Sequence, residues 1–238
     1  SLEEVLLDSN TLLSGTGWGD VEFEARVIAK KNKIKNIAVI DHWVNYSERF
    51  IRDGNKLLPN LILVSDKYAF KKASNCFPST QIEQLPNTYL QDEANLVSSI
   101  RTIENKKSSF ENILIIGETT RRKNSNKENI AIEFLMMNLN KINNSRDNIN
   151  ITLRCHPSYS HSKYDSLINK YKYLVNKFII SKDKELYEEI ALADLVVGMN
   201  SFALVVSLTA GVPTMSILPS GFDKLSLPYD QIIKLRDL

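Results

Sequence analysis

The chain has 238 residues, a length that suits one large domain or two smaller ones. Its hydrophobic content of 43% and charged content of 24% are ordinary for a globular protein, and its formal charge of +2 favours neither nucleic acid nor a strongly anionic surface. Its two cysteines and three histidines stand in no metal-ligand spacing, which argues against a disulfide framework and against a structural zinc site.

The sequence contains no apolar run long enough to span a membrane, and no signal peptide heads it. We therefore expect a cytoplasmic protein, with room for peripheral association at a membrane face. The lysine- and asparagine-rich connectors lack the interleaved aromatic residues that stack on bases, so we expect no nucleic-acid partner. The opening Ser-Leu-Glu-Glu has no methionine and resembles the end of a helix. We expect that a preceding segment, including a first strand, is absent from this sequence.

Short apolar runs alternate with amphipathic stretches, which is typical of βα units that build a parallel sheet. In the first half we expect strands at Thr11–Leu13, Ile37–Ile40, Leu61–Val64 and Gln81–Gln84. We expect helices at Val21–Lys31, Ser47–Asp53, Lys67–Asn75 and about Asp92–Asn105.

The strand–helix pattern begins again after a charged connector at 105–111. The expected strands are Ile113–Ile116, Ile151–Cys155, Phe178–Ile180, Leu195–Val197 and Thr214–Ile217. The expected helices are Glu128–Leu139, Tyr164–Tyr173, Lys184–Leu192 and Phe202–Ala210. This restart predicts an α/β protein with two Rossmann-like lobes, residues 1–105 and 106–238, each with a parallel sheet, and an interlobe cleft. One continuous sheet is the alternative.

Three polar turns follow strands of the second lobe: Gly117, Glu118, Thr119 and Arg121 after the first strand, His156 and Pro157 after the second, and Asn200 and Ser201 after the fourth. Open α/β sheets bind ligands outside the carboxyl ends of their strands, and a helix N-terminus there offers N–H groups to an anion. We therefore predict that these residues bind a nucleotide phosphate. The alternatives are a solvated loop, a structural histidine and a simple N-cap.

In the first lobe, Asp41 and His42 directly follow a strand. A carboxylate and an imidazole at a strand end predict a general base and a group that positions it. The alternative is that Asp41 caps the next helix, with His42 packed at the edge of the lobe.

A glycine-rich loop follows the first strand, and we expect Gly15, Gly17 and Asp20 to contact substrate. Glycines at alternate positions let the backbone approach a ligand closely. The spacing lacks the further glycine of the dinucleotide fingerprint, so it does not indicate a nicotinamide cofactor. A purely structural turn, with Asp20 as the N-cap of the next helix, is the alternative.

With these turns and two lobes, the sequence resembles glycosyltransferases of the GT-B architecture. It is most similar to bacterial enzymes that use cytidine-nucleotide donors: sialyltransferases, Kdo transferases and the glycerophosphotransferases of teichoic acid synthesis. Those families carry a His-Pro motif after one strand and a Ser-Ser or Ser-Thr pair at the start of a later helix. Here His156-Pro157 matches the first motif, whereas the second pair is Asn200-Ser201. The segment 37–50 (IAVIDHWVNYSERF) is also similar to part of surface-polysaccharide proteins.

The resemblance implies an enzyme that moves a sugar from a CMP- or CDP-linked donor to a polysaccharide or glycan acceptor. It implies no cofactor and no metal, since nothing resembles the metal-binding DxD motif of the other glycosyltransferase architecture. One alternative is a nucleotide-sugar 2-epimerase, which shares the two-lobed fold but normally places several carboxylates and histidines in its cleft. The other is a non-catalytic nucleotide-sugar-binding protein of the same fold.

Overall fold

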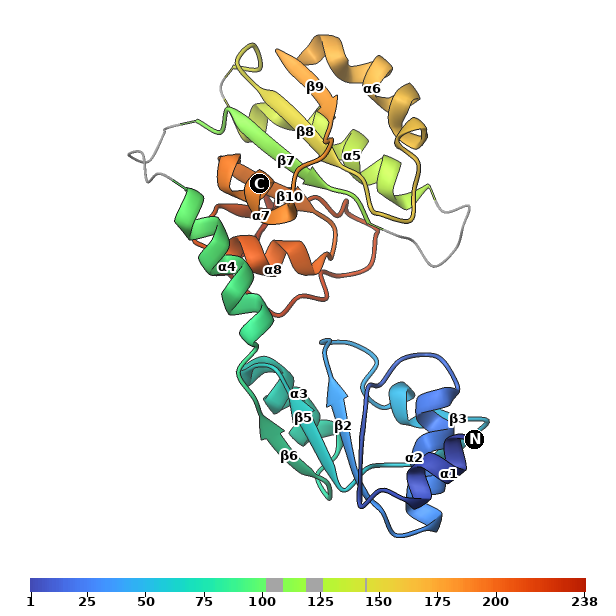
Figure 1. Cartoon of the computed structure of the whole chain (residues 1–238). Helices are drawn as coiled ribbons and strands as arrows, with labels where there is room; N and C mark the ends of the chain where they lie inside the picture. The colour runs from blue at the N-terminus through green and yellow to red at the C-terminus, as the bar shows by residue number, and fades with distance from the viewer. Residues whose placement is uncertain (102–108, 119–125, 144) are drawn as a thin grey trace. The chain divides into compact units, whose positions relative to one another are not determined.

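A computed structural model describes residues 1–101, 109–118, 126–143 and 145–238, and these form two compact units, Ser1–Asn87 and Thr88–Leu238 (Figure 1). The described helices include none with the length and hydropathy needed to cross a membrane. Both units are α/β in character with parallel sheets, as the alternation of apolar runs and amphipathic stretches predicts.

The boundary between the units differs from the expected one at residue 105, because helix α4 (Thr88–Ile100) groups with the second unit. It packs against α7 (Leu186–Leu192) and α8 (Phe202–Thr209). Just beyond α4, the Arg101 guanidinium donates to the backbone carbonyl oxygens of Ala191 and Ala193, at 3.2 and 2.6 Å, near the end of α7. The amphipathic pattern of α4 therefore predicts a helix correctly but does not say which unit its apolar face covers.

The first unit holds a four-stranded parallel sheet in the order β1-β2-β5-β6. Its strands are β1 (Thr11–Ser14), β2 (Lys35–Ile40), β5 (Leu61–Val64) and β6 (Gln81–Gln84). Its helices are α1 (Leu2–Leu7), α2 (Val21–Lys31) and α3 (Lys67–Cys76). The four expected strands are confirmed. In α1 the Ser1 side chain accepts from the Glu4 N–H as part of a capping box.

The helix expected over Ser47–Asp53 is wrong. The chain makes a 3₁₀ turn at Glu48–Phe50 and then a hairpin of β3 (Ile51–Arg52) and β4 (Asn55–Lys56). Asp53 and Gly54 occupy the hairpin turn with φ of 49° and 77°, the left-handed conformation that an Asp-Gly pair adopts readily. The Asp-Gly pair was the local signal for this hairpin, and it outweighs the weak helical pattern before it.

The second unit holds a six-stranded parallel sheet in the order β12-β11-β10-β7-β8-β9. Its strands are β7 (Asn112–Ile116), β8 (Asn150–Arg154), β9 (Lys177–Ile180), β10 (Leu195–Gly198), β11 (Thr214–Ser216) and β12 (Ile233–Lys234). Besides α4, α7 and α8 it contains α5 (Lys127–Met137) and α6 (Asp165–Tyr171). The five expected strands are confirmed, and β12 is an additional edge strand that the sequence did not predict.

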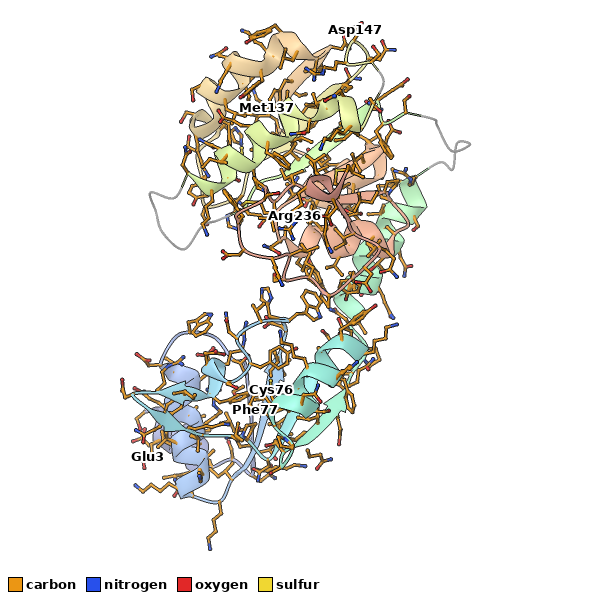
Figure 2. The ribbon with its side chains drawn as sticks, turned by 180° about the vertical axis from the view of Figure 1, so that it is seen from behind. Glu3, Cys76, Phe77, Met137, Asp147 and Arg236 are labelled. Atoms are coloured by element: carbon orange, nitrogen blue, oxygen red, sulfur yellow. The ribbon has the colours of Figure 1, made fainter. Side chains whose placement is uncertain are left out.

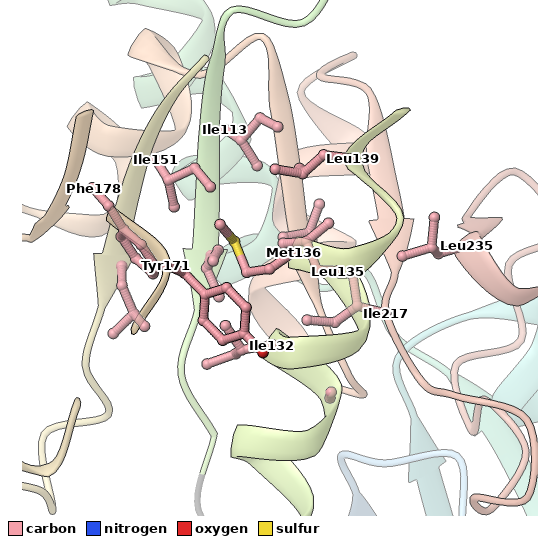
Figure 3. Close-up of a cluster of buried hydrophobic side chains, with 14 of the residues drawn as sticks. Ile113, Ile132, Leu135, Met136, Leu139, Ile151, Tyr171, Phe178, Ile217 and Leu235 are labelled. Atoms are coloured by element: carbon pink, nitrogen blue, oxygen red, sulfur yellow. The ribbon is translucent and has the colours of Figure 1, made fainter. Parts of the chain in front are cut away.

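Helices α5 and α6 cover one face of this sheet, and α7 and α8 lie on the other (Figure 1). Alternate residues of the strands face α5, so Ile113 and Ile151 meet Ile132, Leu135 and Met136 in a closely packed cluster (Figure 3). Burial on both faces explains why β7 and β10 read as unbroken apolar runs. The same packing fixes where these strands end, and therefore where the polar turns after them lie.

We expect Leu135→Ala to lower the free energy of unfolding of the second unit by about 2–5 kcal/mol, because it leaves a cavity in the cluster around α5. Met137 lies on the same helix but is 69% exposed, so Met137→Ala is the matched control and should change little (Figure 2). Urea denaturation followed by far-UV circular dichroism measures the effect. Both tryptophans, Trp18 and Trp43, belong to the first unit, so their fluorescence reports that unit separately. Equal midpoints for the two variants would contradict the packing described here.

Candidate functional site

Three of the polar turns meet at one edge of the second sheet. Strand β7 pairs with β8 on one side and with β10 on the other, all parallel, so their carboxyl ends lie together. The turns after these strands carry Gly117 and Glu118, then His156 and Pro157, then Asn200 and Ser201. The structure thus brings together the described site residues predicted for the second lobe. Thr119 and Arg121, which we also expected here, lie outside the described residues.

The carboxylate of Glu118 is the central group of this edge. Its Oε1 accepts hydrogen bonds from the backbone N–H groups of Met199, Asn200 and Ser201, at 2.6, 2.8 and 3.0 Å. Its Oε2 accepts a further bond from the Asn200 N–H at 3.0 Å. Ser201 is the N-cap of α8, so the carboxylate lies against the positive end of that helix. An internal anion therefore already occupies the helix terminus at which we predicted a phosphate.

Burial raises the pKa of Glu118 to about 7, from an ordinary value of 4.5. The three backbone N–H donors pull the pKa down, and the nearby carboxylate of Glu128 pushes it up. Desolvation is the largest of these effects, so the carboxyl group changes its charge around neutral pH instead of remaining ionised.

A buried network holds the backbone of Glu118 in place. Glu128 lies in the first turn of α5 and is 4% exposed, and its Oε1 accepts from the Glu118 N–H at 2.7 Å and from the Tyr164 hydroxyl at 2.9 Å. The Lys163 ammonium donates to its Oε2 and balances its charge. Burial and the Glu128 carboxylate both raise the pKa of Tyr164, which keeps the hydroxyl protonated as a donor. Sequence analysis missed this network because its members come from separate turns.

Gly117 allows the turn after β7 to pack directly on the turn after β8. A Cβ atom at this position would stand 2.8 Å from the Arg154 carbonyl oxygen, 3.1 Å from the His156 nitrogen and 3.1 Å from the Tyr164 hydroxyl. The Gly117 N–H also donates to that same carbonyl at 2.8 Å. No larger residue fits without moving backbone, so the glycine sets the spacing between Glu118 and the histidine turn.

His156 is half-buried, and its ring is held by its own turn. Nδ1 accepts a hydrogen bond from the Ser158 N–H at 3.1 Å, which places the proton of the neutral ring on Nε2. The ring meets Tyr159 edge-on, with centroids 6.3 Å apart. Pro157 ends the extended chain and is exposed. This arrangement leaves Nε2–H as the hydrogen-bond donor that His156 can offer to an anion.

Asn200 and Ser201 each have a structural role in the turn after β10. The Asn200 Oδ1 accepts from the N–H and the hydroxyl of Ser226, at 2.7 and 3.0 Å, and so fixes the loop that follows β11. The Ser201 hydroxyl accepts from the Ala203 N–H at 3.2 Å, which is ordinary N-capping. The backbone N–H groups of both residues, and not their side chains, point at the anion position.

In the first unit, Asp41 lies at the carboxyl end of β2 with an 80% exposed side chain. Its Oδ1 lies 4.0 Å from the Nη1 of Arg49. The next turn begins after Ser47, so Asp41 is not its N-cap. His42 is exposed and packs edge-on against Trp43, with centroids 6.0 Å apart. The roles of Asp41 and His42 in catalysis stay predictions.

Arginine side chains hold the glycine-rich loop of the first unit by its carbonyl oxygens. Arg26 donates to the Gly15 carbonyl at 3.1 Å, and Arg52 donates to the Gly17 carbonyl at 3.1 Å. Arg52 also lies 3.5 Å from the exposed carboxylate of Asp20, which makes no side-chain capping bond to α2. These contacts give the loop a structural role, and its contact with substrate stays a prediction.

The two buried arginines behind this loop are site-shaping residues that sequence analysis missed. Arg26 is fully buried, and its guanidinium stacks over Phe50 at 5.4 Å. Arg49 is 5% exposed and donates to the Thr16 carbonyl at 2.9 Å. Burial lowers the pKa of Arg26 from its ordinary value. The only sequence signal was that Arg26 falls on the apolar face of α2, between Ala25 and Ala29.

No group of three or more His, Cys, Asp or Glu side chains among the described residues is arranged to hold a metal ion. The backbone N–H groups at the N-terminus of α8 converge on the Glu118 carboxylate. Such donors suit a phosphate or a carboxylate and stabilise negative charge without a metal ion.

Comparison with known proteins supports the fold and leaves the activity open. No protein-family model and no curated protein matches the sequence. Among solved structures, OtsA in its apo form aligns with a TM-score of 0.56 at 8% identity, over 92% of this chain and 62% of that one. UDP-GlcNAc 2-epimerase from Methanocaldococcus jannaschii aligns with 0.54 at 14%, over 90% and 63%. The E. coli trehalose-6-phosphate structure bound with UDP-2-fluoro glucose aligns with 0.52 at 9%, over 92% and 62%.

These similarities show a GT-B-like fold, which confirms the expected fold class. The chain spans somewhat less than two thirds of the length of these structures. At such low identity the likeness concerns the fold alone, so donor, acceptor and reaction have to be argued from the residues.

We expect the Glu118 carboxyl to titrate with a midpoint near pH 7, well above the ordinary glutamate value of 4.5. Carbon-detected NMR of the glutamate side chains measures this directly, and the resonance that disappears in Glu118→Gln identifies it. A midpoint at or below 4.5 would mean that the amide donors fully offset burial.

The sign of the accompanying stability change follows from proton linkage. Between about pH 4.5 and 7 the folded chain binds this proton more tightly than the unfolded chain does, so stability falls as the pH rises through that window. The loss is about 3–4 kcal/mol, since one pKa unit corresponds to about 1.4 kcal/mol. Glu118→Gln should lack this slope in urea denaturation, whereas Glu133→Gln, on α5 and paired with Lys170, should keep it.

Proposed function

We propose that this chain is part of a nucleotide-sugar-dependent enzyme of the GT-B type, one that transfers a sugar from a CMP- or CDP-linked donor to a polysaccharide or glycan acceptor. The observation that carries the proposal is the anion position at the N-terminus of α8. Three consecutive backbone N–H groups converge there on the Glu118 carboxylate, and the turn that carries Glu118 packs against the turn that carries His156. Asn200 and Ser201, one of the two motifs that carry the resemblance to cytidine-nucleotide enzymes, supply two of these N–H groups.

We propose that two kinds of groups assist the transfer reaction. As the bond between sugar and phosphate breaks, negative charge grows on the leaving phosphate, and the positive end of α8 and His156 Nε2–H would stabilise it. The acceptor hydroxyl must lose its proton as it attacks the sugar carbon. We assign that proton to Asp41, an exposed carboxylate at a strand end, with His42 as the alternative base. The loop with Gly15, Gly17 and Asp20 is proposed to contact the substrate.

A 2-epimerase acting on a nucleotide sugar is the second candidate, favoured by the alignment with UDP-GlcNAc 2-epimerase over 90% of this chain. The two activities leave different products. A transferase releases free nucleotide and requires an acceptor, whereas an epimerase interconverts two nucleotide sugars. Chromatography of CMP-, CDP- and UDP-linked sugars after incubation with the protein, with and without glycan acceptors, separates them. A nucleotide-binding protein without activity would leave every donor intact.

We expect CMP or CDP to raise the apparent melting temperature more than UDP or GDP at equal concentration, because a ligand that binds only the folded state stabilises it by mass action. His156→Ala should weaken binding of the preferred nucleotide by about 1–3 kcal/mol, the usual scale for loss of a hydrogen bond to a charged group. His161→Ala, an exposed histidine in the next turn, is the control. Unchanged affinity in titration calorimetry of His156→Ala would make that histidine structural.

If Asp41 is the general base, Asp41→Asn should slow sugar transfer by about 10²–10⁴-fold and leave nucleotide affinity nearly unchanged. Asp53→Asn, at the exposed hairpin turn, serves as the control for loss of one surface carboxylate. Transfer by Asp41→Asn at the parental rate would place the base elsewhere.

A further inference from the structure

A cavity of about 640 Å³ lies on the face of the second sheet that α7 covers in part. Helix α7 packs against β7 there, whereas Figure 1 shows β8 and β9 with no described helix in front of them. The register aligns Leu114, Thr152 and Ile179 across these three strands, and all three residues line the cavity. The volume lies within the range of small-molecule sites, roughly 300–1,000 Å³. The lining does not include Glu118 or His156, so the cavity is separate from the edge described above.

Two apolar side chains of the lining are exposed. Ile179 on β9 is 39% exposed, and Leu192 at the end of α7 is 57% exposed. On the opposite face of the same strands, Ile151 and Phe178 are buried in the core under α5 and α6. The sheet therefore has one fully covered face and one that is covered only in part. A ligand with an apolar body would remove Ile179 and Leu192 from water, which is favourable.

The lining also offers hydroxyl groups to a ligand. The Thr152 and Ser181 hydroxyls have no hydrogen-bond partner among the described residues. Thr152 lies in the middle of β8, between Leu114 and Ile179 on the neighbouring strands. A hydroxyl at this place can donate a hydrogen bond to a ligand or accept one from it.

Lysine side chains give the cavity a positive charge. Lys177 begins β9, and Lys182 and Lys184 follow its end. All three are exposed, and none forms an ion pair with a described carboxylate. Glu189 is the acidic residue of the lining, and its charge is balanced by Arg154 at 2.7 Å. The charge of the cavity therefore favours an anion.

The acidic residues next to these lysines lie outside the lining. Asp183 and Glu185 are exposed, and the Glu188 carboxylate accepts from the Glu185 N–H at 2.8 Å in the first turn of α7. Asp194 accepts from the backbone and side-chain N–H groups of Asn112, at 2.8 and 3.1 Å. None of these four carboxylates belongs to the cavity wall.

We propose that this cavity binds a small amphipathic anion, a molecule with an apolar body and a carboxylate, sulfate or phosphate group at one end. The anionic group lies beside Lys182, Lys184 and the Ser181 hydroxyl. The apolar body lies along Ile179 and Leu192. This site goes beyond the proposed function and does not depend on it.

The length of the cavity suits a free small molecule better than the chain of a membrane lipid. A strand rises about 3.3 Å per residue, so the lining from Lys177 to Ser181 extends over roughly 13 Å. Two of the three lysines lie at the carboxyl end of β9, and this places the anionic group at that end.

The probe is biphenyl-4-carboxylate, with biphenyl-4-carboxamide as its neutral counterpart of the same shape and acetate as a charge without an apolar body. Amide NMR of the isotope-labelled chain gives both affinity and location. With the carboxylate we expect saturable shifts at Thr152, Ile179 and Ser181. The carboxamide should bind about tenfold more weakly, the size of two exposed ion pairs, and acetate should not saturate the site. CMP should not displace the probe.

Lys182→Gln combined with Lys184→Gln should weaken binding of the carboxylate about tenfold and leave binding of the carboxamide unchanged. Lys141→Gln combined with Lys170→Gln is the matched control, because it removes the same charge. Lys141 lies in the turn after α5 and Lys170 lies on α6, on the other face of the sheet. This control should bind both compounds like the wild type.

Leu192→Glu should weaken binding of both compounds, because it replaces an apolar wall of the cavity. Met137→Glu on α5, where the side chain is 69% exposed, adds the same charge and should change neither affinity. Both positions are exposed, so both variants should fold, and far-UV circular dichroism checks this.

Equal affinity for the carboxylate and the carboxamide, or wild-type binding of the carboxylate by the double lysine variant, would overturn the inference. So would saturable shifts centred on the face under α5, or no saturable binding. Sedimentation with vesicles of phosphatidylcholine and phosphatidic acid tests the membrane alternative: vesicle binding that requires Lys182 and Lys184, without binding of the probe, also overturns it. Binding of CMP at α8 without binding of the probe would leave the proposed nucleotide site standing while this inference fails.

Discussion

The contact between the Glu118 carboxylate and three consecutive backbone N–H groups organises the second unit's functional edge. It links the turn after β7 to the turn after β10 through residues that are 81 to 83 positions apart in sequence, with bonds of 2.6–3.0 Å. A buried carboxylate is costly without such partners, and here the donors and the positive end of α8 offset much of that cost. What remains is visible as a raised pKa, which makes the edge sensitive to charge near neutral pH.

Two glycines and a buried hydrogen-bond network support the contact between Glu118 and the N-terminus of α8. Gly117 lets the turn approach β8, and at Gly198 a Cβ would stand 3.2 Å from the Glu118 carboxylate itself. The Glu128 carboxylate accepts a hydrogen bond from the Glu118 N–H and so fixes the backbone there. Its two oxygens also accept from Tyr164 and Lys163, so both have partners in this buried network. The functional edge is therefore a set of interlocked turns on a rigid sheet, which is the arrangement expected when a site must keep its geometry before a ligand arrives.

The sequence predicted the strands well because each is a short apolar run buried by regular periodicity, as in Ile113–Ile116 and Leu195–Val197. It also predicted which turns share one edge, since parallel strands place their carboxyl ends together. It did not predict that Glu118 accepts hydrogen bonds from the helix terminus, because that contact joins residues far apart in the chain. The helix expected over Ser47–Asp53 was wrong, because Asp53 and Gly54 adopt the left-handed conformation of a hairpin turn. The burial of Arg26 and Arg49 could hardly be predicted from the sequence. It depends on hydrogen bonds to carbonyl oxygens of the glycine-rich loop, which is distant in sequence.

The central claim is that a nucleotide phosphate binds at the N-terminus of α8, beside Glu118 and His156. Amide NMR of the isotope-labelled chain during addition of CMP tests it most directly. The account predicts that the largest shift changes fall on the N–H groups of Met199, Asn200 and Ser201, together with the His156 ring. Saturable shifts centred elsewhere in the chain, with these residues unmoved, would contradict it.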